Sequence, residues 1–453
     1  MDWRPEIGGG DAPAYQRIVE ALEGDIARGA LTPGARLPTQ RALAHRLGLG
    51  IGTVTRAYTE AGQRGLIGGV VGRGSFVVGT APPAGDGIID LARNLPPMGP
   101  AKAALRTAMA AIAKRADLAE RLDYAPDGGF PADRRAAAAW LARAANFADA
   151  DPARIVMTSG AQQGIFVALA AACRAGEALI VEAATFHGAK LAAAQVGLRL
   201  VPAEMDAEGL TPDALERAAA ESGARTAYVQ PYQNPTARVM SLARRREIIE
   251  AANRVGVLLI EDDLYGPIVG SLGLPPLARL APDAVAYVAG LSKSLGPGLR
   301  SGFMMLPDRL LGAAHDVLRV AAFGSPSFSA PIGTHWIETG EAFDILDAVR
   351  RELAARAALA GRLLGGMVER TVAAATAHLW APAGELDAER IAGAALRAGV
   401  RLTSPTAPFA PGAPVDGLRI CLGSAPDMPT LERGLAVVAT LLQPGHSLAE
   451  NVV

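Results

Sequence analysis

The chain has 453 residues, with 44 lysines and arginines against 45 aspartates and glutamates, and a formal net charge of -1 at pH 7. Half of its residues are hydrophobic and 20% are charged, which excludes a disordered chain and leaves apolar material for roughly two to four domains. It has no apolar run long enough to span a membrane and no signal-peptide pattern at its start, so we expect a cytoplasmic protein. The two cysteines, Cys173 and Cys421, lie far apart without nearby ligand residues, which predicts neither a disulfide framework nor a metal site.

The near-neutral total hides a basic stretch close to the start of the chain. Residues 33–78 contain six arginines and a single acid, Glu60, which gives this stretch a net charge of +5. Such a charge attracts a polyanion such as DNA. Charge alone is also typical of a solvated surface, so the apolar pattern around the arginines has to decide between the two interpretations.

That apolar pattern predicts three helices followed by a hairpin. The first helix covers residues 14–28, the second begins at a candidate N-cap position, Thr39, and the third covers residues 52–63. Two short strands follow at 66–67 and 75–78, around a turn rich in glycine and arginine. This order predicts a winged helix-turn-helix, whose last helix enters the major groove of DNA while the wing approaches the backbone or the minor groove.

Three motifs in this region resemble the DNA-binding domain of the GntR family: GARLPTQR at 34–41, TVTRAY at 53–58 and GRGSFV at 72–77. The resemblance covers about residues 12–78. It implies DNA contacts at a set of polar and glycine positions, to which the basic stretch adds Arg36. These positions are Arg41, Thr53, Thr55, Arg56, Arg73 and Gly74. A winged helix that contacts only other proteins is the alternative, and the charge of +5 argues against it.

A linker separates this domain from a different kind of sequence. Residues 79–87 are made of glycine, proline and other helix breakers, and a proline-rich stretch continues to about residue 100. Beyond it, short apolar strands alternate with amphipathic helices. The expected strands are 155–157, 178–181, 226–229, 257–260, 285–288 and 302–305, with helices at 161–173, near 188 and at 241–255. This alternation indicates an α/β fold with a mainly parallel sheet, in which ligands bind at the strand ends.

Two of the turns that follow expected strands suit an anionic ligand. Residues 159–162, Ser-Gly-Ala-Gln, lie between a strand and a helix N-terminus, where free backbone N–H groups favour a phosphate. Asn234 follows another strand, and its amide can donate to a ligand oxygen. Taken singly, each feature also fits an ordinary turn.

Further along, an acid and a lysine follow two more strands. Asp262 closes an apolar strand, and Tyr265 comes three residues later. Lys293 is one of only four lysines; it follows the strand 285–288 and precedes Arg300 by seven residues. A solvent-exposed lysine is the ordinary alternative. The rarity of lysine here and the placement between a strand and a Gly/Pro loop favour a functional lysine.

These groups together suit pyridoxal phosphate. That cofactor needs a lysine amine for an imine, a carboxylate for its ring nitrogen, donors for its phenolate oxygen and an anion site for its phosphate. The order of the residues resembles the aspartate-aminotransferase-like proteins of fold type I, over about residues 88–440. The resemblance implies that Lys293 forms the imine, that Asp262 pairs with the ring nitrogen, and that Asn234 and Tyr265 bond the phenolate oxygen.

The same resemblance implies roles for residues outside these turns. Phe186 would stack on the pyridine ring, although an ordinary core aromatic is the alternative. Arg300 and the backbone of Gly160, Ala161 and Gln162 would bind the phosphate. Tyr124 is similar to the tyrosine that reaches the phosphate of a neighbouring subunit, which implies a homodimer. Arg419 is similar to the arginine that grips a substrate carboxylate, against the alternative of an unrelated surface arginine.

A GntR-type winged helix joined to an aminotransferase-like domain resembles the MocR-like bacterial transcription regulators. We therefore expect four parts: a winged helix-turn-helix at 1–78, a linker at 79–100, a large cofactor-binding domain at 101–305 and a smaller C-terminal domain at 306–453. The leading hypothesis is a regulator that binds DNA and senses an amine or amino acid through pyridoxal phosphate. A genuine aminotransferase with an accessory DNA-binding domain is the alternative, and a cofactor fold kept only as a dimerisation scaffold is a third.

Overall fold

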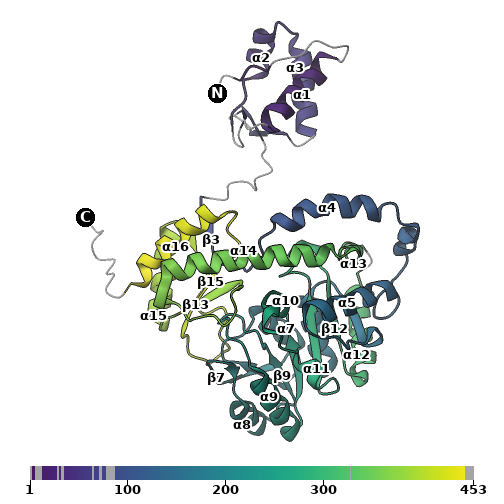
Figure 1. Ribbon diagram of the computed structural model, residues 1–453, viewed down its shortest axis with the longest axis vertical. Coiled ribbons are helices and arrows are strands. Elements are labelled where there is room, and N and C mark those ends of the chain that lie inside the picture. The colour runs from purple at the N-terminus through teal and green to yellow at the C-terminus, as the bar shows by residue number, and fades with distance from the viewer. Residues whose placement is uncertain are drawn as a thin grey trace. The chain divides into compact units, whose positions relative to one another are not determined.

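The computed structural model describes residues 3–5, 13–27, 30–31, 35–63, 66–70, 74–77, 87–326 and 328–443. The chain divides into two compact units, Met1–Gly87 and Ile88–Val453 (Figure 1). Within the described residues, no helix combines the length and the apolar character needed to cross a membrane.

Unit 1 contains the expected three helices and hairpin: α1 (Ala14–Ala27), α2 (Gln40–Leu47), α3 (Ile51–Gln63), β1 (Ile67–Val70) and β2 (Gly74–Val77). Thr39 caps α2 as the sequence predicts, because its Oγ1 accepts a hydrogen bond from the backbone of Ala42 at 3.2 Å. The hairpin differs from the expectation in one respect. β1 continues to Val70, which pairs with Gly74, so the turn is shorter than the predicted stretch of residues 68–74.

The core of unit 1 lies between the three helices. Ile18, Leu43 and Val54 come from α1, α2 and α3 respectively, and all three are almost completely buried. Trp3 also belongs to this core, and its indole nitrogen donates to Asp25 at 2.7 Å. The apolar spacing of the helices therefore produces one small core, which holds α3 in place.

Unit 2 is built on a seven-stranded sheet. In spatial order the strands are β4 (Ile155–Thr158), β12 (Gly302–Met305), β11 (Val285–Gly290), β10 (Leu258–Asp262), β9 (Thr226–Val229), β5 (Ala178–Glu182) and β6 (Arg199–Ala203). β12 runs antiparallel to both neighbours, and the other pairs are parallel. This confirms the expected mainly parallel sheet. The sequence did not predict β6, because an edge strand with exposed residues such as Arg199 and Pro202 lacks a continuous apolar run.

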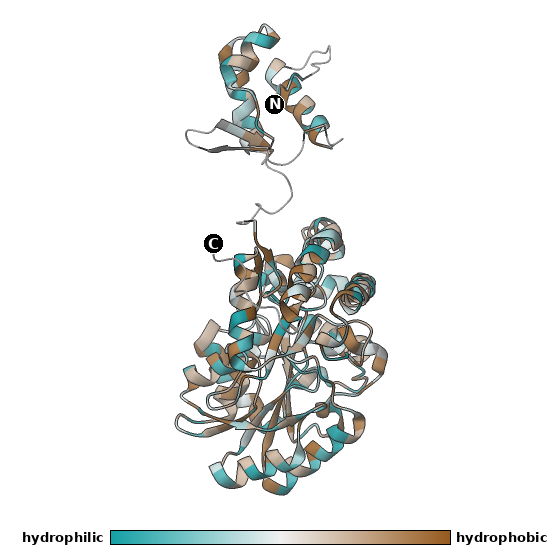
Figure 2. Ribbon diagram, turned by 90° about the vertical axis from the view of Figure 1, so that its left-hand side faces the viewer, coloured by the Kyte–Doolittle hydropathy of each residue, from teal (hydrophilic) through white to brown (hydrophobic). Residues whose placement is uncertain are grey.

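Helices surround this sheet. They include α5 (Pro131–Ala144), α6 (Ala161–Ala172), α7 (His187–Val196), α8 (Pro212–Ser222), α9 (Leu242–Val255), α12 (Asp308–Ala322) and α13 (Ala330–Thr339). Figure 2 shows brown, apolar strands inside unit 2 and teal, polar residues on the outer helices. This is the pattern expected for a sheet covered on both faces.

A second, smaller core forms from the C-terminal part of unit 2. It contains the antiparallel pair β13 (His378–Pro382) and β15 (Gly417–Cys421), with α15 (Glu385–Arg397) and α16 (Met428–Leu442). The long helix α14 (Glu341–Leu364) joins the two cores, since Leu353 belongs to the first and Leu364 to the second (Figure 1). Buried Arg356, between them, donates to two main-chain carbonyls, those of residues 422 and 425, at 2.8 Å.

One strand of this smaller core lies in the segment that the sequence predicts to be a linker. β3 (Ile89–Asp90) pairs in parallel with β14 (Val400–Arg401). A two-residue strand is too short to show an apolar alternation, which is why the sequence does not reveal it. The predicted division of the following chain into 101–305 and 306–453 stays a prediction.

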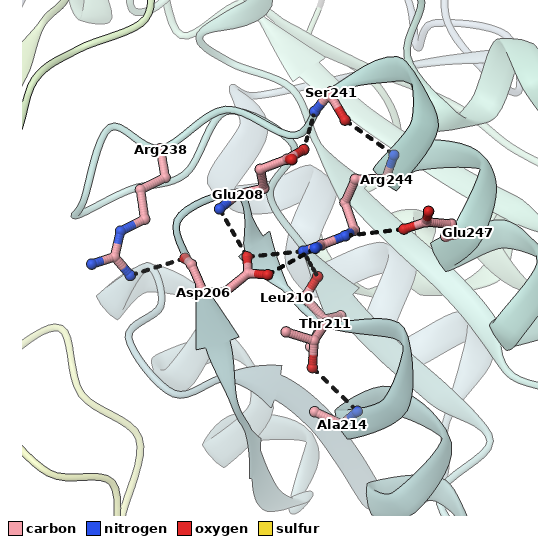
Figure 3. A network of polar contacts seen from close by, with 9 residues as sticks. All are labelled: Asp206, Glu208, Leu210, Thr211, Ala214, Arg238, Ser241, Arg244 and Glu247. Atoms are coloured by element: carbon pink, nitrogen blue, oxygen red, sulfur yellow. Dashed lines mark hydrogen bonds and ion pairs between the residues drawn. The ribbon is translucent and has the colours of Figure 1, made fainter.

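A polar network fixes the loop that leads from β9 to α9. The guanidinium of Arg244 donates to both carboxylate oxygens of Asp206, in β7 (Met205–Asp206), at 2.9 and 2.7 Å (Figure 3). Glu208 accepts a hydrogen bond from the backbone of Ser241, and Arg238 donates to the carbonyl of Asp206. Hydrogen bonding to Arg244 lowers the pKa of Asp206, so the pair stays charged near neutral pH. The loop that carries Asn234 is therefore held at its C-terminal end.

Candidate functional site

The candidate site lies where several strands of the large sheet end. β9, β10 and β11 are parallel neighbours, so their carboxyl ends meet at one edge of the sheet. Asp262 is the last residue of β10, Asn234 follows β9, and Lys293 comes three residues after the end of β11. The fold thereby gathers residues that are far apart in the sequence.

Lys293 is partly buried, and its amine is held by the main chain. Nζ donates to the carbonyl oxygen of Asn94 at 2.6 Å. Burial lowers the pKa of Lys293 to about 8, and the positive charge of Arg419 adds to this effect, whereas Asp262 opposes it. A sizeable fraction of the amine is therefore neutral at physiological pH, which is the form that attacks a carbonyl carbon.

Asp262 is buried and has one unused acceptor. Tyr228 donates from its hydroxyl to Oδ2 of Asp262 at 2.5 Å. The other oxygen, Oδ1, is buried and has no hydrogen-bond partner among the described residues. Burial raises the pKa of Asp262 to about 6, against the opposing effects of the Tyr228 hydrogen bond and the Lys293 charge. A buried acceptor without a donor calls for a ligand that carries an N–H group.

A candidate anion cradle lies at the N-terminus of α6. Gly160 precedes this helix with φ +84°, and a Cβ at this position would lie 2.7 Å from Nη2 of Arg300. Nη2 of Arg300 also donates to the carbonyl of Ser159 at 2.8 Å. A Cβ on Gly302 would approach the backbone nitrogen of Ala161 to 2.7 Å. The two glycines therefore let a guanidinium and the helix N-terminus come close together, as binding of a phosphate requires.

The third predicted member of this cradle behaves differently. The side chain of Gln162 donates to the carbonyl of Gly188 at 2.8 Å, at the start of α7. A Cβ on Gly188 would also meet the ring of Phe186, which precedes α7 and is partly buried. The side chain of Gln162 therefore holds the turn that carries Phe186. Its backbone belongs to the first turn of α6.

Arg419, on β15, is firmly oriented. Its Nη1 donates to Oδ1 of Asn234 at 2.7 Å, its Nη2 to the carbonyl of Ala92 at 3.1 Å and its Nε to Oγ1 of Thr403 at 3.2 Å. A guanidinium has five N–H donors, so one N–H on each Nη atom remains. Two donors in a fixed fork suit a carboxylate.

Two residues of the site were not predicted from the sequence. The amide nitrogen of Asn94 donates to the hydroxyl of Tyr265 at 2.9 Å and to Nδ1 of His378 at 2.8 Å. Nδ1 is therefore the acceptor, and Nε2 of His378 faces the carbonyl of Gln233 at 3.4 Å. Burial lowers the pKa of His378 to about 3, so its ring is neutral. Asn94 lies in the predicted linker. The sequence around His378 does not distinguish it from the other histidines.

Tyr124 stands apart from this group within the chain. Its side chain is 72% exposed, and its ring centroid lies 4.6 Å from that of Phe323. Phe409 packs against Trp380 and pairs with Ala184, beside the turn that carries Phe186.

In unit 1, most of the predicted DNA-contacting side chains lie at the surface. Arg36, Arg41, Thr55 and Arg56 are exposed, and Thr53 is partly buried. Gly74 begins β2, whereas Arg73 lies outside the described residues.

Two of these side chains have partners in their own domain. Oγ1 of Thr55 donates to the side chain of Gln40 at 2.9 Å. The guanidinium of Arg56 lies 4.1 Å from the ring centroid of Tyr15. These contacts orient two residues of α3 before any DNA is bound.

Comparison with known proteins agrees with this two-part organisation. Residues 14–77 match the family of bacterial regulatory proteins of the gntR type, and residues 86–438 match aminotransferase class I and II. These matches define a helix-turn-helix protein with an aminotransferase-like domain. The chain belongs to the aminotransferase class I and II family. Together with the gntR-type N-terminal domain, this makes it one of the MocR-like transcription regulators.

The relatives include transcription regulators and aminotransferases. The uncharacterized HTH-type transcriptional regulator YdeF of Bacillus subtilis (strain 168) is 30% identical over 319 residues, which cover 68% of each chain. An archaeal alanine:glyoxylate aminotransferase matches with a TM-score of 0.71 and 22% identity, over 78% of this chain and 90% of its own. The α-aminoadipate aminotransferase LysN of Thermus thermophilus, complexed with N-(5'-phosphopyridoxyl)-L-leucine, matches with a TM-score of 0.70 and 24% identity, over 79% and 92%. The structural matches establish the fold alone.

Proposed function

We propose that unit 2 binds pyridoxal phosphate at Lys293 and senses an amine or amino acid there, and that this changes how unit 1 binds DNA. The observation that carries the proposal is the convergence of a partly buried lysine of low pKa, a buried carboxylate with a free oxygen and an oriented arginine at one sheet edge. These groups fit the cofactor. When bound, pyridoxal phosphate supplies an aldehyde for the lysine and a pyridine ring that withdraws electrons.

The chain's own residues would hold the cofactor from several sides. Oδ1 of Asp262 would accept from the ring nitrogen, while Tyr228 keeps the carboxylate oriented through Oδ2. Asn234 uses its amide oxygen on Arg419, which leaves its N–H groups for the phenolate oxygen. Tyr265, already a partner of Asn94, can turn its hydroxyl proton to the same oxygen. Phe186 would stack on one face of the ring.

The phosphate would lie at the N-terminus of α6. Arg300 and the backbone N–H groups of Ala161 and Gln162 would supply the positive field that a dianion needs. The N–H of Gly160 donates to the carbonyl of Thr158 at 2.8 Å, so Gly160 would contribute through its lack of a side chain. Tyr124, exposed on one chain, would complete this site from the partner in a homodimer. The two remaining N–H groups of Arg419 would take the carboxylate of an amino acid ligand.

Unit 1 would contact DNA through α3 and the β1–β2 wing. Exposed Arg36, Arg41 and Arg56 supply positive charge, and Thr53 and Thr55 supply hydroxyl groups on the face of α3. The resemblance to the gntR family adds Arg73 and Gly74 as expected DNA contacts, and Gly74 begins β2. Since DNA is the target, we expect the protein to act in the cytoplasm.

Spectral titration tests the sensing proposal. The protein is loaded with pyridoxal phosphate, and its visible absorbance is followed during titration with the twenty amino acids and simple amines, with Lys293→Ala as the control. We expect a lysine-dependent band and a shift with a subset of ligands. A band that Lys293→Ala leaves unchanged, or no band at all, contradicts cofactor binding at this lysine. Sustained turnover with an amino donor and a keto acid would instead identify an aminotransferase.

A further inference from the structure

The segment that begins unit 2 runs directly into the ligand site. In β3, the backbone of Ile89 donates to the carbonyl of Gly399 at 2.7 Å, and the backbone of Leu91 donates to that of Arg401 at 2.8 Å. Leu91 is completely buried in the smaller core. The segment is therefore attached to the smaller core before it reaches Asn94.

Close packing leaves the following residues little freedom. The backbone of Cys421 donates to the carbonyl of Leu91 at 2.8 Å. Oδ1 of Asp90 accepts from the backbone of Ala92 at 2.9 Å, which closes a tight turn. A Cβ on Gly423 would lie 1.8 Å from the carbonyl oxygen of Leu95, so the segment passes directly over this glycine. A displacement at one point of such a segment moves its neighbours as well.

Two carbonyl oxygens of the segment hold the two cationic groups of the site. The carbonyl of Ala92 accepts from Nη2 of Arg419 at 3.1 Å, and that of Asn94 accepts from Nζ of Lys293 at 2.6 Å. The side chain of Asn94 donates to Tyr265 and His378, and its own Oδ1 is buried without a partner among the described residues. One short stretch thus contacts the predicted cofactor lysine, a predicted phenolate donor and the predicted carboxylate-binding arginine.

A ligand that engages Lys293 and Arg419 changes these hydrogen bonds. Attachment of the cofactor aldehyde to Nζ, with loss of water, would remove donor hydrogens from the amine and weaken its bond to the carbonyl of Asn94. An amino acid that then takes the place of Lys293 on the cofactor would return these hydrogens to the amine. A carboxylate bound by the remaining N–H groups of Arg419 would attract the same guanidinium that donates to the carbonyl of Ala92. The position of the segment is therefore coupled to occupation of the site, as a ligand-driven shift between two states requires.

We propose that residues 92–94 form the relay that reports ligand binding to the DNA-binding unit, with Asn94 as its positioning residue. The proposal rests on the proposed function. Asn94 lies six residues after Ile88, the first residue of unit 2, and every covalent path between the two units passes through this segment. A ligand that shifts the relay changes DNA affinity, and by reciprocity DNA changes ligand affinity by the same factor.

The variant Asn94→Ala tests the relay, with Asn253→Ala, an exposed asparagine on α9, as the matched control. DNA affinity is measured on a duplex selected by the full-length protein from random-sequence DNA, with and without the amino acid that gives a spectral shift. In the wild type and in Asn253→Ala we expect the amino acid to change DNA affinity by roughly 5- to 150-fold. Asn94→Ala is measured at a ligand concentration that saturates its own spectral shift, and there we expect the ligand-induced change in DNA affinity to fall to about twofold or less.

Hydrogen exchange in the wild-type full-length chain provides the second measurement. With pyridoxal phosphate present, the same amino acid is expected to alter hydrogen exchange at the amides of Ile89 and Leu91. If Asn94→Ala loses its spectral shift, this exchange measurement on the wild type tests the relay in its place. A merely structural role for Asn94 would leave these amides unchanged. Full retention of DNA coupling in Asn94→Ala, or unchanged exchange at both amides, would overturn the relay. Absence of any spectral shift in the wild type would overturn the proposed function instead.

Discussion

Arg419 and Asn234 lie 185 positions apart in the chain, yet Nη1 of Arg419 donates a hydrogen bond to Oδ1 of Asn234 at 2.7 Å. This contact joins β15 of the smaller core to the loop that follows β9 of the large sheet. It fixes the orientation of both groups. The amide N–H groups of Asn234 and the free N–H groups of Arg419 are then available to a ligand between the two parts of unit 2.

Replacement of Arg419 should weaken the binding of amino acids but not that of amines without a carboxylate. In Arg419→Met the carboxylate loses its charge-assisted hydrogen bonds, which are worth about 1.5–3 kcal/mol, so the dissociation constant should rise roughly 10- to 150-fold. The decarboxylated amine of the same ligand should bind as it does to the wild type. Spectral titration of both ligands checks this, with the exposed Arg433→Met as the control. Equal losses for both ligands would contradict carboxylate binding by Arg419.

Cofactor attachment should follow the low pKa of Lys293. The neutral amine is the reactive form, and burial lowers the pKa from 10.5 to about 8. The rate of attachment should therefore rise about tenfold per pH unit below pH 8 and level off above it. Stopped-flow absorbance at a series of pH values measures this. A rate that keeps rising toward pH 10 would show that the lysine has an ordinary pKa.

A methyl group at Gly160 should impair the anion cradle. Gly160→Ala places a Cβ against Arg300 and adds backbone strain at φ +84° and ψ +164°, a region almost restricted to glycine, which costs about 1–3 kcal/mol of folding stability. Displacement of Arg300 should weaken binding of pyridoxal phosphate roughly tenfold or more. Gly256→Ala, with φ +65° and ψ +39° at the end of α9, is the control for an alanine at positive φ outside the cradle. Equal cofactor affinity in the two variants would argue against a phosphate at Gly160.

Removal of one basic side chain from unit 1 should change the salt dependence of DNA binding. If exposed Arg41 neutralises one phosphate, Arg41→Ala should reduce the slope of log affinity against log salt by about 0.9. Arg397→Ala, an exposed arginine on α15, should leave the slope unchanged. Fluorescence anisotropy over a range of salt concentrations measures both. An unaltered slope in Arg41→Ala would remove this residue from the DNA interface.

The fold of unit 2 could be predicted where burial leaves a pattern in the sequence. Residues Val285–Gly290 are all buried, and their continuous apolar run marks a central strand. β6 and β3 escaped prediction for different reasons, since one is an exposed edge and the other has only two residues. Neither an exposed edge strand nor a two-residue strand produces a continuous apolar run in the local sequence.

The candidate site could be predicted where its residues follow strands. Asp262 and Lys293 stand after apolar runs, and parallel strands bring such positions together. Asn94 could not be predicted in the same way, because its partners Tyr265 and His378 lie 171 and 284 positions away. Contacts of this range depend on how the smaller core packs against the large sheet. The roles assigned to these residues stay predictions until a ligand is measured.

Reduction of the cofactor-loaded protein with borohydride, followed by peptide mass spectrometry, tests the central claim most directly. Borohydride converts a cofactor bound through a lysine imine into a stable pyridoxyl adduct on that lysine. We predict the adduct on Lys293 and none on Lys190, whose pKa burial also lowers and whose Nζ donates to the carbonyl of Phe409. An adduct on Lys190 or another lysine, or an unmodified protein, would contradict the account.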